Sequence, residues 1–408
     1  MKTVDNIRTL IVGLLLMCSS GHIAIAKPSD SFRLREFNLP TTGTSQQHNL
    51  SKTTDGHLIV SWVETDGQNS TVKFATLEGE KFSIVHEVIQ VEGKLAAAPV
   101  VLSLSDGTLV VAWMPYPQRK GENRYLTDIY LARSIDGGLS WSPPLKPYGD
   151  AAHIYDAQMS LTALPDRRLA LVWTDMRHVS PDSTADKKYN RHQLMATVID
   201  KDWLPSPEIT LDADVCSCCS SYTATLADTL VTVYRDHLPG EIRDISAVRW
   251  TPFGNIQSTL VNSDGWVING CPSNGPSVDM SPTHTVAAWF SAADGKGRVK
   301  VAFSEDSAAH FESPIELDNN ASGYANALLL DDGSALAGWR GRAGPQDELK
   351  IGKVSKSGKL SRQTTVYRGG FPKWPSKHLA MTRIGQQAFM AWTDPQQKRV
   401  RLVLVRLD

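Results

Sequence analysis

Apolar and polar residues alternate along most of this chain, and the alternation is organised into units that recur at roughly 50 to 60 residues. In each unit an apolar run ends in an aromatic residue, and a second alternating run follows. These aromatic residues are Trp62, Trp113, Trp173, Tyr234, Trp289, Trp339 and Trp392. A period of two is typical of β-strands, and a turn signal such as Asp55-Gly56 usually precedes the aromatic residue. The pattern therefore predicts three strands in every unit.

Units of this length that contain only strands are typical of the blades of a β-propeller, in which four-stranded sheets surround a central channel. Helical solenoids are excluded because their side chains do not alternate with a period of two. We expect an all-β propeller with seven blades, and six blades is the alternative. The units are residues 45–90, 97–147, 157–213, 216–262, 271–318, 323–368 and 370–408. The recurring aromatic side chains are expected to be buried between neighbouring blades.

The last unit lacks a fourth strand, and the N-terminal run Phe32–Leu39 alternates as a strand does. Pairing of this run with residues 398–407 would place the first and last segments of the chain in one blade. Such pairing closes the ring and removes two exposed strand edges. We therefore predict a single propeller domain, residues 27–408, that is closed by an N-terminal strand.

Residues 1–26 have the features of a secretory signal peptide, with Lys2 and Arg8 before an apolar stretch and a small-residue site at Ala24-Ile25-Ala26. No later apolar stretch approaches the roughly 20 residues of a membrane-spanning helix. We expect a periplasmic or secreted protein without a transmembrane segment. The net charge is −1 and the basic residues are scattered, which argues against nucleic acid as a partner. A closed propeller is expected to be a monomer.

The mature chain keeps Cys216, Cys218, Cys219 and Cys271 once Cys18 leaves with the signal peptide. In an exported protein these cysteines favour one or two disulfides: a bridge from Cys271 to one of the crowded three, and a second pair within the three, such as Cys216 with Cys219. The alternative is a thiolate site for Cu(I) or Zn(II), because soft metals prefer sulfur ligands. Both alternatives stay open, and no other cofactor is expected.

Residues 134–141 follow the pattern Ser-x-Asp-x-Gly-x-x-Trp, and residues 304–311 are a degenerate copy at the same place in the fifth unit. The defining residues are Ser134, Asp136, Gly138 and Trp141 in the first copy and Ser304, Asp306 and Phe311 in the second. These residue types predict a turn in which the aspartate accepts backbone hydrogen bonds and the aromatic residue packs underneath. The pattern resembles the Asp-box of sialidases and related BNR-repeat proteins. In that superfamily the boxes lie away from the active site, so the resemblance implies that Asp136 and Asp306 are not catalytic.

The resemblance to the sialidase superfamily covers nearly every unit of the mature chain. The segments Cys-Ser-Cys-Cys, Tyr-Arg-Asp, Ile-Arg-Asp-Ile and Gly-Cys-Pro-Ser-Asn-Gly-Pro also resemble a bacterial sialidase-like BNR family. This resemblance implies recognition of a glycan or another anionic ligand, with an exo-acting glycosidase of sialidase type as the alternative. Sialidases have six blades and open with Phe/Tyr-Arg-Ile-Pro, where this chain has seven units and Phe32-Arg33-Leu34-Arg35.

The candidate site lies around the fourth and fifth units, where the loops between second and third strands meet the loops that lead into the innermost strands. A glycosidase needs arginines, an acid and a nucleophile, and the candidates for these roles are Arg235, Asp236, Glu241, Arg243 and Asp244. Asp175 is a further candidate acid. The candidate ligand-binding residues are Tyr234, Asn274, Arg340 and Arg342. The polar segment 177–192 is either a lid over the channel or an exposed insertion.

Three interpretations of this sector stay open. In the first, disulfides join the fourth and fifth units and the charged residues form ion pairs. In the second, the cysteines hold a soft metal ion. In the third, the charged residues carry out glycosidic catalysis.

Overall fold

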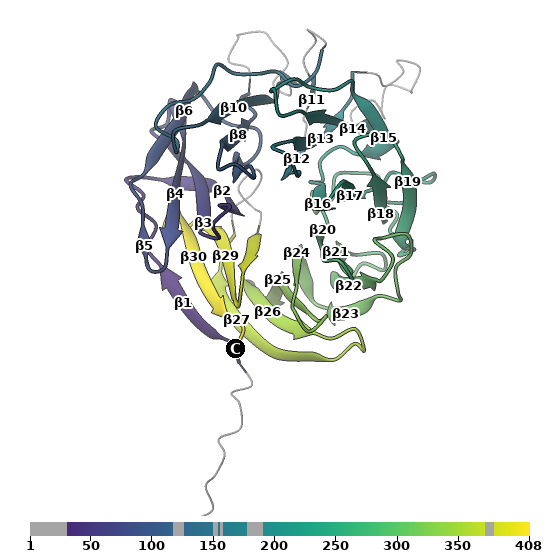
Figure 1. Ribbon diagram of the computed structural model, residues 1–408. Coiled ribbons are helices and arrows are strands. Elements are labelled where there is room, and N and C mark those ends of the chain that lie inside the picture. Colours follow the sequence, from purple (N-terminus) through teal and green to yellow (C-terminus); the bar gives the residue numbers. More distant parts are fainter. Residues whose placement is uncertain (1–30, 117–125, 150–153, 156–157, 178–190, 372–378) are drawn as a thin grey trace, which may run out of the picture.

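The computed structural model describes residues 31–116, 126–149, 154–155, 158–177, 191–371 and 379–408. Its antiparallel sheets are arranged as seven blades around a central channel, so the protein is an all-β, seven-bladed propeller (Figure 1). The described residues form no helix, and hence none that is long and apolar enough to cross a membrane. The expected signal peptide and most of segment 177–192 lie outside the described residues.

Each blade is an antiparallel sheet with its first strand at the channel and its last strand at the rim. Blade one contains β2 (Ser45–Lys52), β3 (Leu58–Thr65), β4 (Asn69–Glu78), β5 (Lys81–Phe82) and β6 (His86–Glu92); blade two contains β7 (Val100–Ser103), β8 (Leu109–Trp113) and β10 (Tyr130–Ser134). Blade three contains β12 (Met159–Ala163), β13 (Leu169–Asp175), β14 (Arg191–Ile199) and β15 (Ile209–Cys216); blade four contains β16 (Tyr222–Leu226), β17 (Thr229–Arg235), β18 (Ile245–Trp250) and β19 (Gln257–Asn262). Blade five contains β20 (Ser277–Met280), β21 (Thr285–Ser291), β22 (Arg298–Ser304) and β23 (Ile315–Asp318); blade six contains β24 (Ala321–Leu329), β25 (Ala335–Ala343), β26 (Gln346–Val354) and β27 (Leu360–Gly369). Blade seven contains β28 (Ala380–Ile384), β29 (Gln387–Asp394), β30 (Arg399–Arg406) and β1 (Arg33–Phe37).

Blade two departs slightly from the common plan. Its rim position is held by Leu145, whose backbone exchanges two hydrogen bonds with Leu131 of β10, at 2.8 and 2.7 Å. The short strands β9 (Leu126–Thr127) and β11 (Ile154–Tyr155) pair with each other and join the loop of blade two to the connection into blade three.

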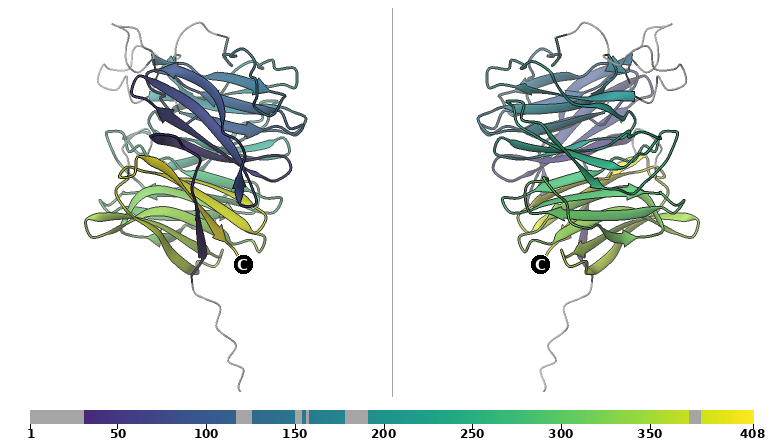
Figure 2. Two further views of the ribbon diagram at one scale, coloured as in Figure 1. Left: turned by 90° about the vertical axis from the view of Figure 1, so that its left-hand side faces the viewer. Right: turned by 90° about the vertical axis from the view of Figure 1, so that its right-hand side faces the viewer.

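The ring is closed by the N-terminal strand, as the alternating pattern predicts. Strand β1 pairs antiparallel with β30, in a register that runs from Arg33 opposite Arg406 to Phe37 opposite Leu402. In Figures 1 and 2 the purple β1 lies beside the yellow β30 at the rim of the last blade. The prediction of seven blades with a shared first and last blade is therefore confirmed.

The recurring aromatic residues form the contacts between blades. All seven have side chains that are 3% exposed or less. Each packs against the preceding blade: Trp62 shares an apolar cluster with Phe389 of blade seven, and Trp289 shares one with Val231 of blade four. Their burial removes large apolar surfaces from water, which stabilises each boundary between blades.

Residues 134–141, which follow the pattern Ser-x-Asp-x-Gly-x-x-Trp, form a tight turn after β10. Asp136 accepts a hydrogen bond from the Ser140 backbone N–H at 2.9 Å. Gly138 has a φ of 94°, and a Cβ there would lie 2.6 Å from the ring of Phe74, so the turn needs glycine. Trp141 packs edge-on against Phe74, with ring centroids 6.2 Å apart.

The degenerate copy after β22 forms the same turn without glycine. Asp306 accepts a hydrogen bond from the His310 backbone N–H at 2.9 Å. Ala308 takes the place of the glycine with a φ of 64°, and its N–H donates to the Ser304 hydroxyl at 2.9 Å. Phe311 packs against the apolar boundary between blades four and five. Both copies therefore have a local role in the turn.

Candidate functional site

Two sets of loops meet at one end of the propeller, which we call the upper face. They are the loops between the second and third strands of a blade and the connections from one blade to the next. Strand β15 ends at Cys216 on this face, and the connection to β16 carries Cys218 and Cys219. The connection from β19 to β20 carries Cys271. Neighbouring connections thus bring the four cysteines together.

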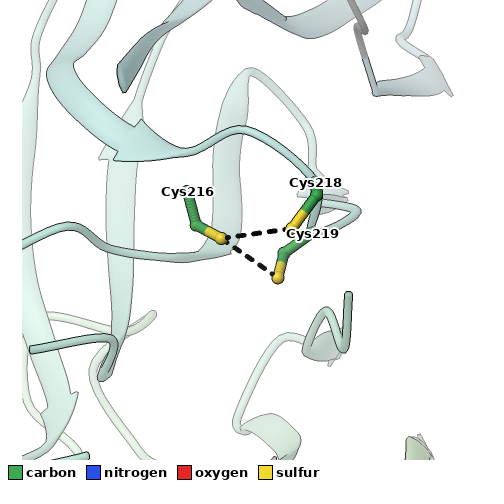
Figure 3. A group of neighbouring side chains, drawn as sticks. All are labelled: Cys216, Cys218 and Cys219. Carbon is green, nitrogen blue, oxygen red and sulfur yellow. Dashed lines mark hydrogen bonds between the residues drawn. The ribbon is translucent and has the colours of Figure 1, made fainter. Parts of the chain in front are cut away.

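One disulfide joins these connections. It links Cys218 to Cys271, whose Cα atoms are 6.0 Å apart, and we call it the staple. The predicted bridge from Cys271 to the crowded cysteines is therefore present. Cys216 and Cys219 are buried thiols, with their Sγ atoms 3.3 Å apart (Figure 3).

The three crowded sulfurs are a potential soft-metal ligand set. The Sγ atoms of Cys216, Cys218 and Cys219 all lie within 4.8 Å of one another. The hydrogen bond with Cys219 and burial raise the pKa of the Cys216 thiol, while the charges of Arg243 and Arg235 act in the opposite direction. Because the staple uses the Cys218 sulfur, two thiols are available to a metal in this state, which fits Cu(I) better than four-coordinate Zn(II).

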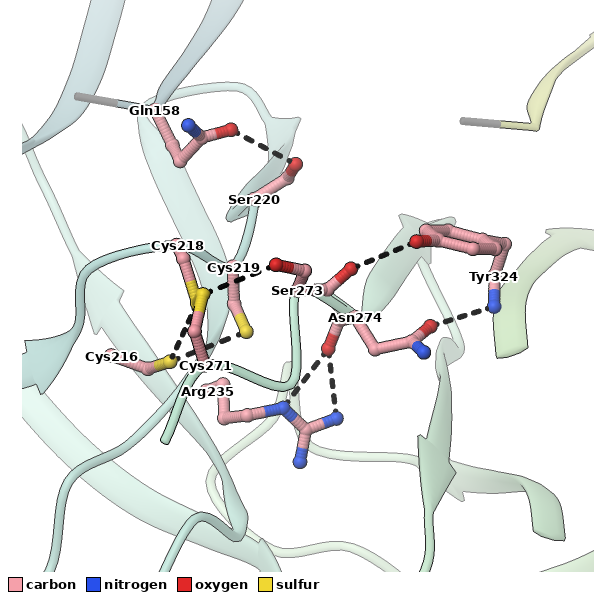
Figure 4. The surroundings of a disulfide bond; sticks show 10 residues. All are labelled: Gln158, Cys216, Cys218, Cys219, Ser220, Arg235, Cys271, Ser273, Asn274 and Tyr324. Carbon is pink, nitrogen blue, oxygen red and sulfur yellow. Dashed lines mark hydrogen bonds between the residues drawn. A yellow bond between two sulfur atoms is a disulfide. The ribbon is translucent and has the colours of Figure 1, made fainter. Parts of the chain in front are cut away.

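Arg235 of blade four is buried and donates hydrogen bonds to backbone carbonyls of blade five and of the connection that leads into it. Its guanidinium is 1% exposed and donates to the backbone carbonyl of Asn274 at 2.9 and 2.8 Å (Figure 4). It also donates to the carbonyls of Phe290 (2.7 Å) and Arg243 (2.5 Å). The guanidinium lies over the ring of Trp266, 4.7 Å from its centroid. The N–H groups that an arginine would donate to an anionic ligand are therefore already bound to backbone carbonyls in Arg235.

The neighbouring charged residues also have partners within the protein. The Asp244 carboxylate accepts the backbone N–H groups of Gly265 and Trp266, at 2.8 and 2.9 Å. Arg243 is 1% exposed and donates to Glu241 at 2.8 Å. Glu241 is partly exposed; burial raises its pKa, but hydrogen bonds from Arg243 and His237 outweigh this and lower it below its usual value.

The carboxylates of Asp212, Asp214 and Asp236 lie close together where blades three and four meet. Tyr234 is buried and its hydroxyl donates to Asp212 at 2.5 Å. Asp236 is 7% exposed and accepts the Ser246 hydroxyl at 2.6 Å. Burial, together with the negative charges of Asp212 and Asp214, raises the pKa of Asp236 to about 6.

The other candidate residues occupy separate places. The Asn274 side chain accepts the backbone N–H of Tyr324 at 2.8 Å. Arg340 lies over the rings of Tyr324 and Phe371, at 5.0 and 4.2 Å, and pairs with Asp347 at 2.5 Å. Arg342 is exposed at the end of β25.

Asp175, the further candidate acid, lies in blade three. It is fully buried, and its carboxylate accepts the indole N–H of Trp173 at 2.8 Å. It also pairs with Arg177 at 2.7 Å. The candidate residues therefore fall into four groups: the staple with Arg235 and Asn274, the charged residues of blade four, the arginines of blade six, and Asp175 in blade three.

The channel holds a cavity of about 250 Å³ below the upper face. Polar side chains of blades one, three and four line it, among them His48, Gln158 and Ser221. The Ser221 hydroxyl is buried and has no hydrogen-bond partner among the described residues. Sequence reasoning did not single out these three residues, because an isolated polar residue within an innermost strand, like His48, or just before one, like Gln158 and Ser221, belongs to no motif.

A wider cavity of about 990 Å³ opens at the opposite end of the channel, between the hairpins that join first to second strands. Its charged lining residues include Lys52, Asp279, Asp331 and Arg383. Arg383 pairs with Asp331 at 2.5 Å, and the Asp279 carboxylate accepts the Leu329 backbone N–H at 2.8 Å. This cavity contains none of the residues predicted to form the site.

No model of a known protein family matches this chain, and no curated protein sequence matches it. Its fold is similar to that of several solved propellers. An ulvan lyase of a new polysaccharide lyase family is 10% identical, with a TM-score of 0.55 and 92% of this chain and 96% of that chain covered. An oligogalacturonate lyase in complex with manganese is 14% identical, with a TM-score of 0.54 and coverage of 93% and 97%. A Hadza microbial sialidase is 13% identical, with a TM-score of 0.51 and coverage of 89% and 66%. At these identities the likeness establishes a shared propeller fold.

Proposed function

We propose that the protein recognises a glycan or a small anionic ligand on the upper face, at the channel cavity that blade four helps to line. The observation that carries the proposal is the channel cavity of about 250 Å³, which has polar side chains within a mixed lining. The buried, unpartnered hydroxyl of Ser221 lines this cavity, and a hydroxyl-rich ligand such as a terminal sugar would supply its missing hydrogen bond. The cavity is slightly smaller than the roughly 300 to 1,000 Å³ of drug-sized ligand sites, which suits one sugar residue.

An anionic group on the ligand would be bound by blade six. Arg342 is exposed on the same face, and its guanidinium can make two parallel hydrogen bonds to a carboxylate. Arg340 lies between two aromatic rings beside it and keeps one buried donor, Nε, without a partner among the described residues. These two arginines are better suited to a ligand than Arg235, whose donors are bound to carbonyls.

Exo-acting hydrolysis of sialidase type is the alternative on this face. It needs an acid, a nucleophile and arginines that reach the substrate. Arg235, Asp236 and Asp244 are buried and hydrogen-bonded within the protein. Recognition without turnover is therefore the better-supported function. We further propose that the mature chain, residues 27–408, is an exported monomer.

A soft-metal site is a second candidate, favoured by the contact between the Cys216 and Cys219 thiols. These two thiols would hold Cu(I), and opening of the staple would add two further sulfurs. Elemental analysis of the purified chain, before and after reduction of the staple, tests this candidate.

Calorimetric titration of the mature chain with neutral and acidic oligosaccharides tests the leading proposal. We expect Ser221→Val to weaken binding about tenfold, the effect of one lost hydrogen bond of about 1.4 kcal/mol. Arg342→Ala should weaken binding of acidic oligosaccharides only. The matched control is Thr283→Val, which lies at the opposite cavity and should change nothing.

Two results would contradict the proposal. One is binding that neither Ser221→Val nor Arg342→Ala weakens. The other is turnover of a fluorogenic sialoside that Arg243→Ala abolishes, which would support the hydrolase instead.

A further inference from the structure

Four sulfur atoms on the upper face form one chain of contacts from the interior to solvent. The Cys216 Sγ is 3.3 Å from the Cys219 Sγ and 3.8 Å from the Cys218 Sγ, which belongs to the staple. The other sulfur of the staple belongs to Cys271, which is exposed. Cys216 and Cys219 also have the Cys-x-x-Cys spacing of dithiols that form and break disulfides.

Disulfides exchange when a thiolate attacks a sulfur of the bridge, and the attack needs the two sulfurs in contact. Cys216 already has this relation to the staple. We propose that the four cysteines form a thiol–disulfide exchange site, which passes two electrons from the buried pair Cys216 and Cys219 through the staple to an external disulfide. This activity is independent of ligand binding in the channel.

The first two steps move the disulfide within the protein. The Cys216 thiol gives up its proton to solvent and its sulfur attacks the Cys218 Sγ; the bond between Cys218 and Cys271 breaks, and Cys271 leaves as a thiolate. The Cys219 sulfur then attacks the Cys216 Sγ, and Cys218 leaves and takes up the proton that Cys219 gives up. The disulfide now joins Cys216 to Cys219, and no electrons have left the chain.

The last two steps transfer the electrons. The Cys271 thiolate attacks the external disulfide and forms a mixed disulfide, and the external thiolate that is released takes up a proton from solvent, which balances the proton given up by Cys216. The Cys218 sulfur attacks Cys271, which restores the staple and releases the second external thiol. In sum, the buried pair is oxidised to a disulfide and one external disulfide is reduced to two thiols.

The loops are held in place by contacts that do not depend on the staple. Arg235 binds the Asn274 carbonyl, and the Tyr324 hydroxyl donates to the Ser273 carbonyl at 3.1 Å (Figure 4). A Cβ on Gly275 would lie 2.1 Å from the Ser220 carbonyl oxygen, so the two connections are in close contact there. Because these contacts persist when the staple opens, Cys218 and Cys271 stay close enough to bond again.

Oxidation of the mature chain by oxidised glutathione tests the proposal. The chain is purified without reductant, samples are quenched by alkylation, and disulfides are mapped by mass spectrometry. We expect the wild type to gain a disulfide between Cys216 and Cys219 and to end with its staple intact. The double variant Cys218→Ser/Cys271→Ser keeps the buried pair but has no exposed sulfur. Glutathione should therefore oxidise its buried pair at least about tenfold more slowly than that of the wild type. A small oxidant, hydrogen peroxide, should oxidise the buried pair at similar rates in both proteins.

A second variant keeps the staple and therefore its contribution to folding. Cys219→Ser stops the sequence after the first step, so Cys271 should accumulate a mixed disulfide with glutathione. Three outcomes would overturn the proposal: equal rates of glutathione-driven oxidation in the wild type and the double variant, no glutathione on Cys271 in Cys219→Ser, or a stoichiometric metal ion that keeps both thiols reduced. Thermal melts show whether each variant is folded, so that a reaction lost through unfolding is not counted as one of these outcomes.

Discussion

Blades four and six have an aromatic residue at the same point of the second strand, but the carboxylate beside that residue has different partners in the two blades. In blade six the indole N–H of Trp339 donates to Asp318 at 2.8 Å. Lys350 lies opposite Trp339 on the next strand and pairs with the same carboxylate at 3.1 Å. Blade five repeats this arrangement with Trp289, Asp264 and Lys300.

In blade four the residue opposite the aromatic side chain is not a cation. The Tyr234 hydroxyl donates to Asp212, but the residue opposite Tyr234 is Ser246 instead of a lysine. Ser246 donates to a second carboxylate, Asp236, whose pKa is raised to about 6. With serine at the cross-strand position, Asp212 is bound by a hydroxyl instead of an ammonium group, and Asp236 is buried close to it with a raised pKa, while Asp214 pairs with His237 at 2.8 Å. This group lies beside the segment that carries Cys216, Cys218 and Cys219.

Lys350→Met makes blade six resemble blade four and is expected to have the largest effect. It leaves Asp318 buried without its cation, and breaking a buried ion pair costs about 3 to 5 kcal/mol. Because Lys350 keeps 17% of its side chain exposed, we expect a loss of about 3 kcal/mol in the free energy of unfolding. Urea denaturation at neutral pH measures it.

The matched control for this change is Lys353→Met. Lys353 pairs with Asp332 at 2.5 Å on the surface, where both side chains are substantially exposed. Exposed pairs contribute less than about 1 kcal/mol, so the control should be nearly neutral. Equal losses in the two variants would mean that Asp318 does not depend on Lys350, and the contrast between the blades would fail.

The fold could be predicted from the sequence because every blade repeats the same physical requirement. A sheet between two neighbours needs alternating side chains and a large apolar residue at each boundary, and both features recur from Trp62 to Trp392. Strand β1 was predictable because blade seven had an unpaired edge. The meeting of the cysteine segment with the segment around Cys271 followed from the order of the blades.

The internal roles of the charged residues could not be predicted. Arg235 is bound by carbonyls of Asn274, Phe290 and Arg243, and a carbonyl oxygen carries no sequence signal because every residue has one. The choice of Cys218 as the partner of Cys271 depends on side-chain directions that spacing does not give. The catalytic and ligand-binding roles stay predictions.

Asp236→Asn should change how stability depends on pH. The folded pKa of Asp236 is about 6, above the unfolded value of about 3.9, so the folded protein binds the proton more tightly. The resulting stabilisation is complete below pH 4 and is lost as the pH rises through 6. Two pKa units correspond to about 3 kcal/mol, so the wild type should lose up to about 3 kcal/mol relative to the variant between pH 4 and pH 7.

Free energies of unfolding of both proteins at several pH values provide the test. The difference between the proteins cancels the titration of all other groups. Asp332→Asn is the control of opposite sign: burial raises the pKa of Asp332, but Lys353 and Ser334 outweigh this and hold it at about 2. Relative to the wild type, the Asp332→Asn variant should therefore lose stability as the pH rises through about 4. A flat difference for Asp236→Asn would show that blade four neutralises its carboxylates after all.

Tyr234→Phe tests the remaining donor of blade four and should have the smallest effect. It removes the hydroxyl that binds Asp212, and hydrogen bonds to charged groups contribute about 1.5 to 3 kcal/mol. Asp212 is partly exposed, so water replaces much of the lost bond and we expect about 1 kcal/mol. Tyr130→Phe, which keeps the ring stacked on Trp113 in blade two, is the matched control and should cost less than about 0.5 kcal/mol. If Tyr234→Phe is also neutral, water already solvates Asp212, and the difference between blades four and six is limited to Asp236.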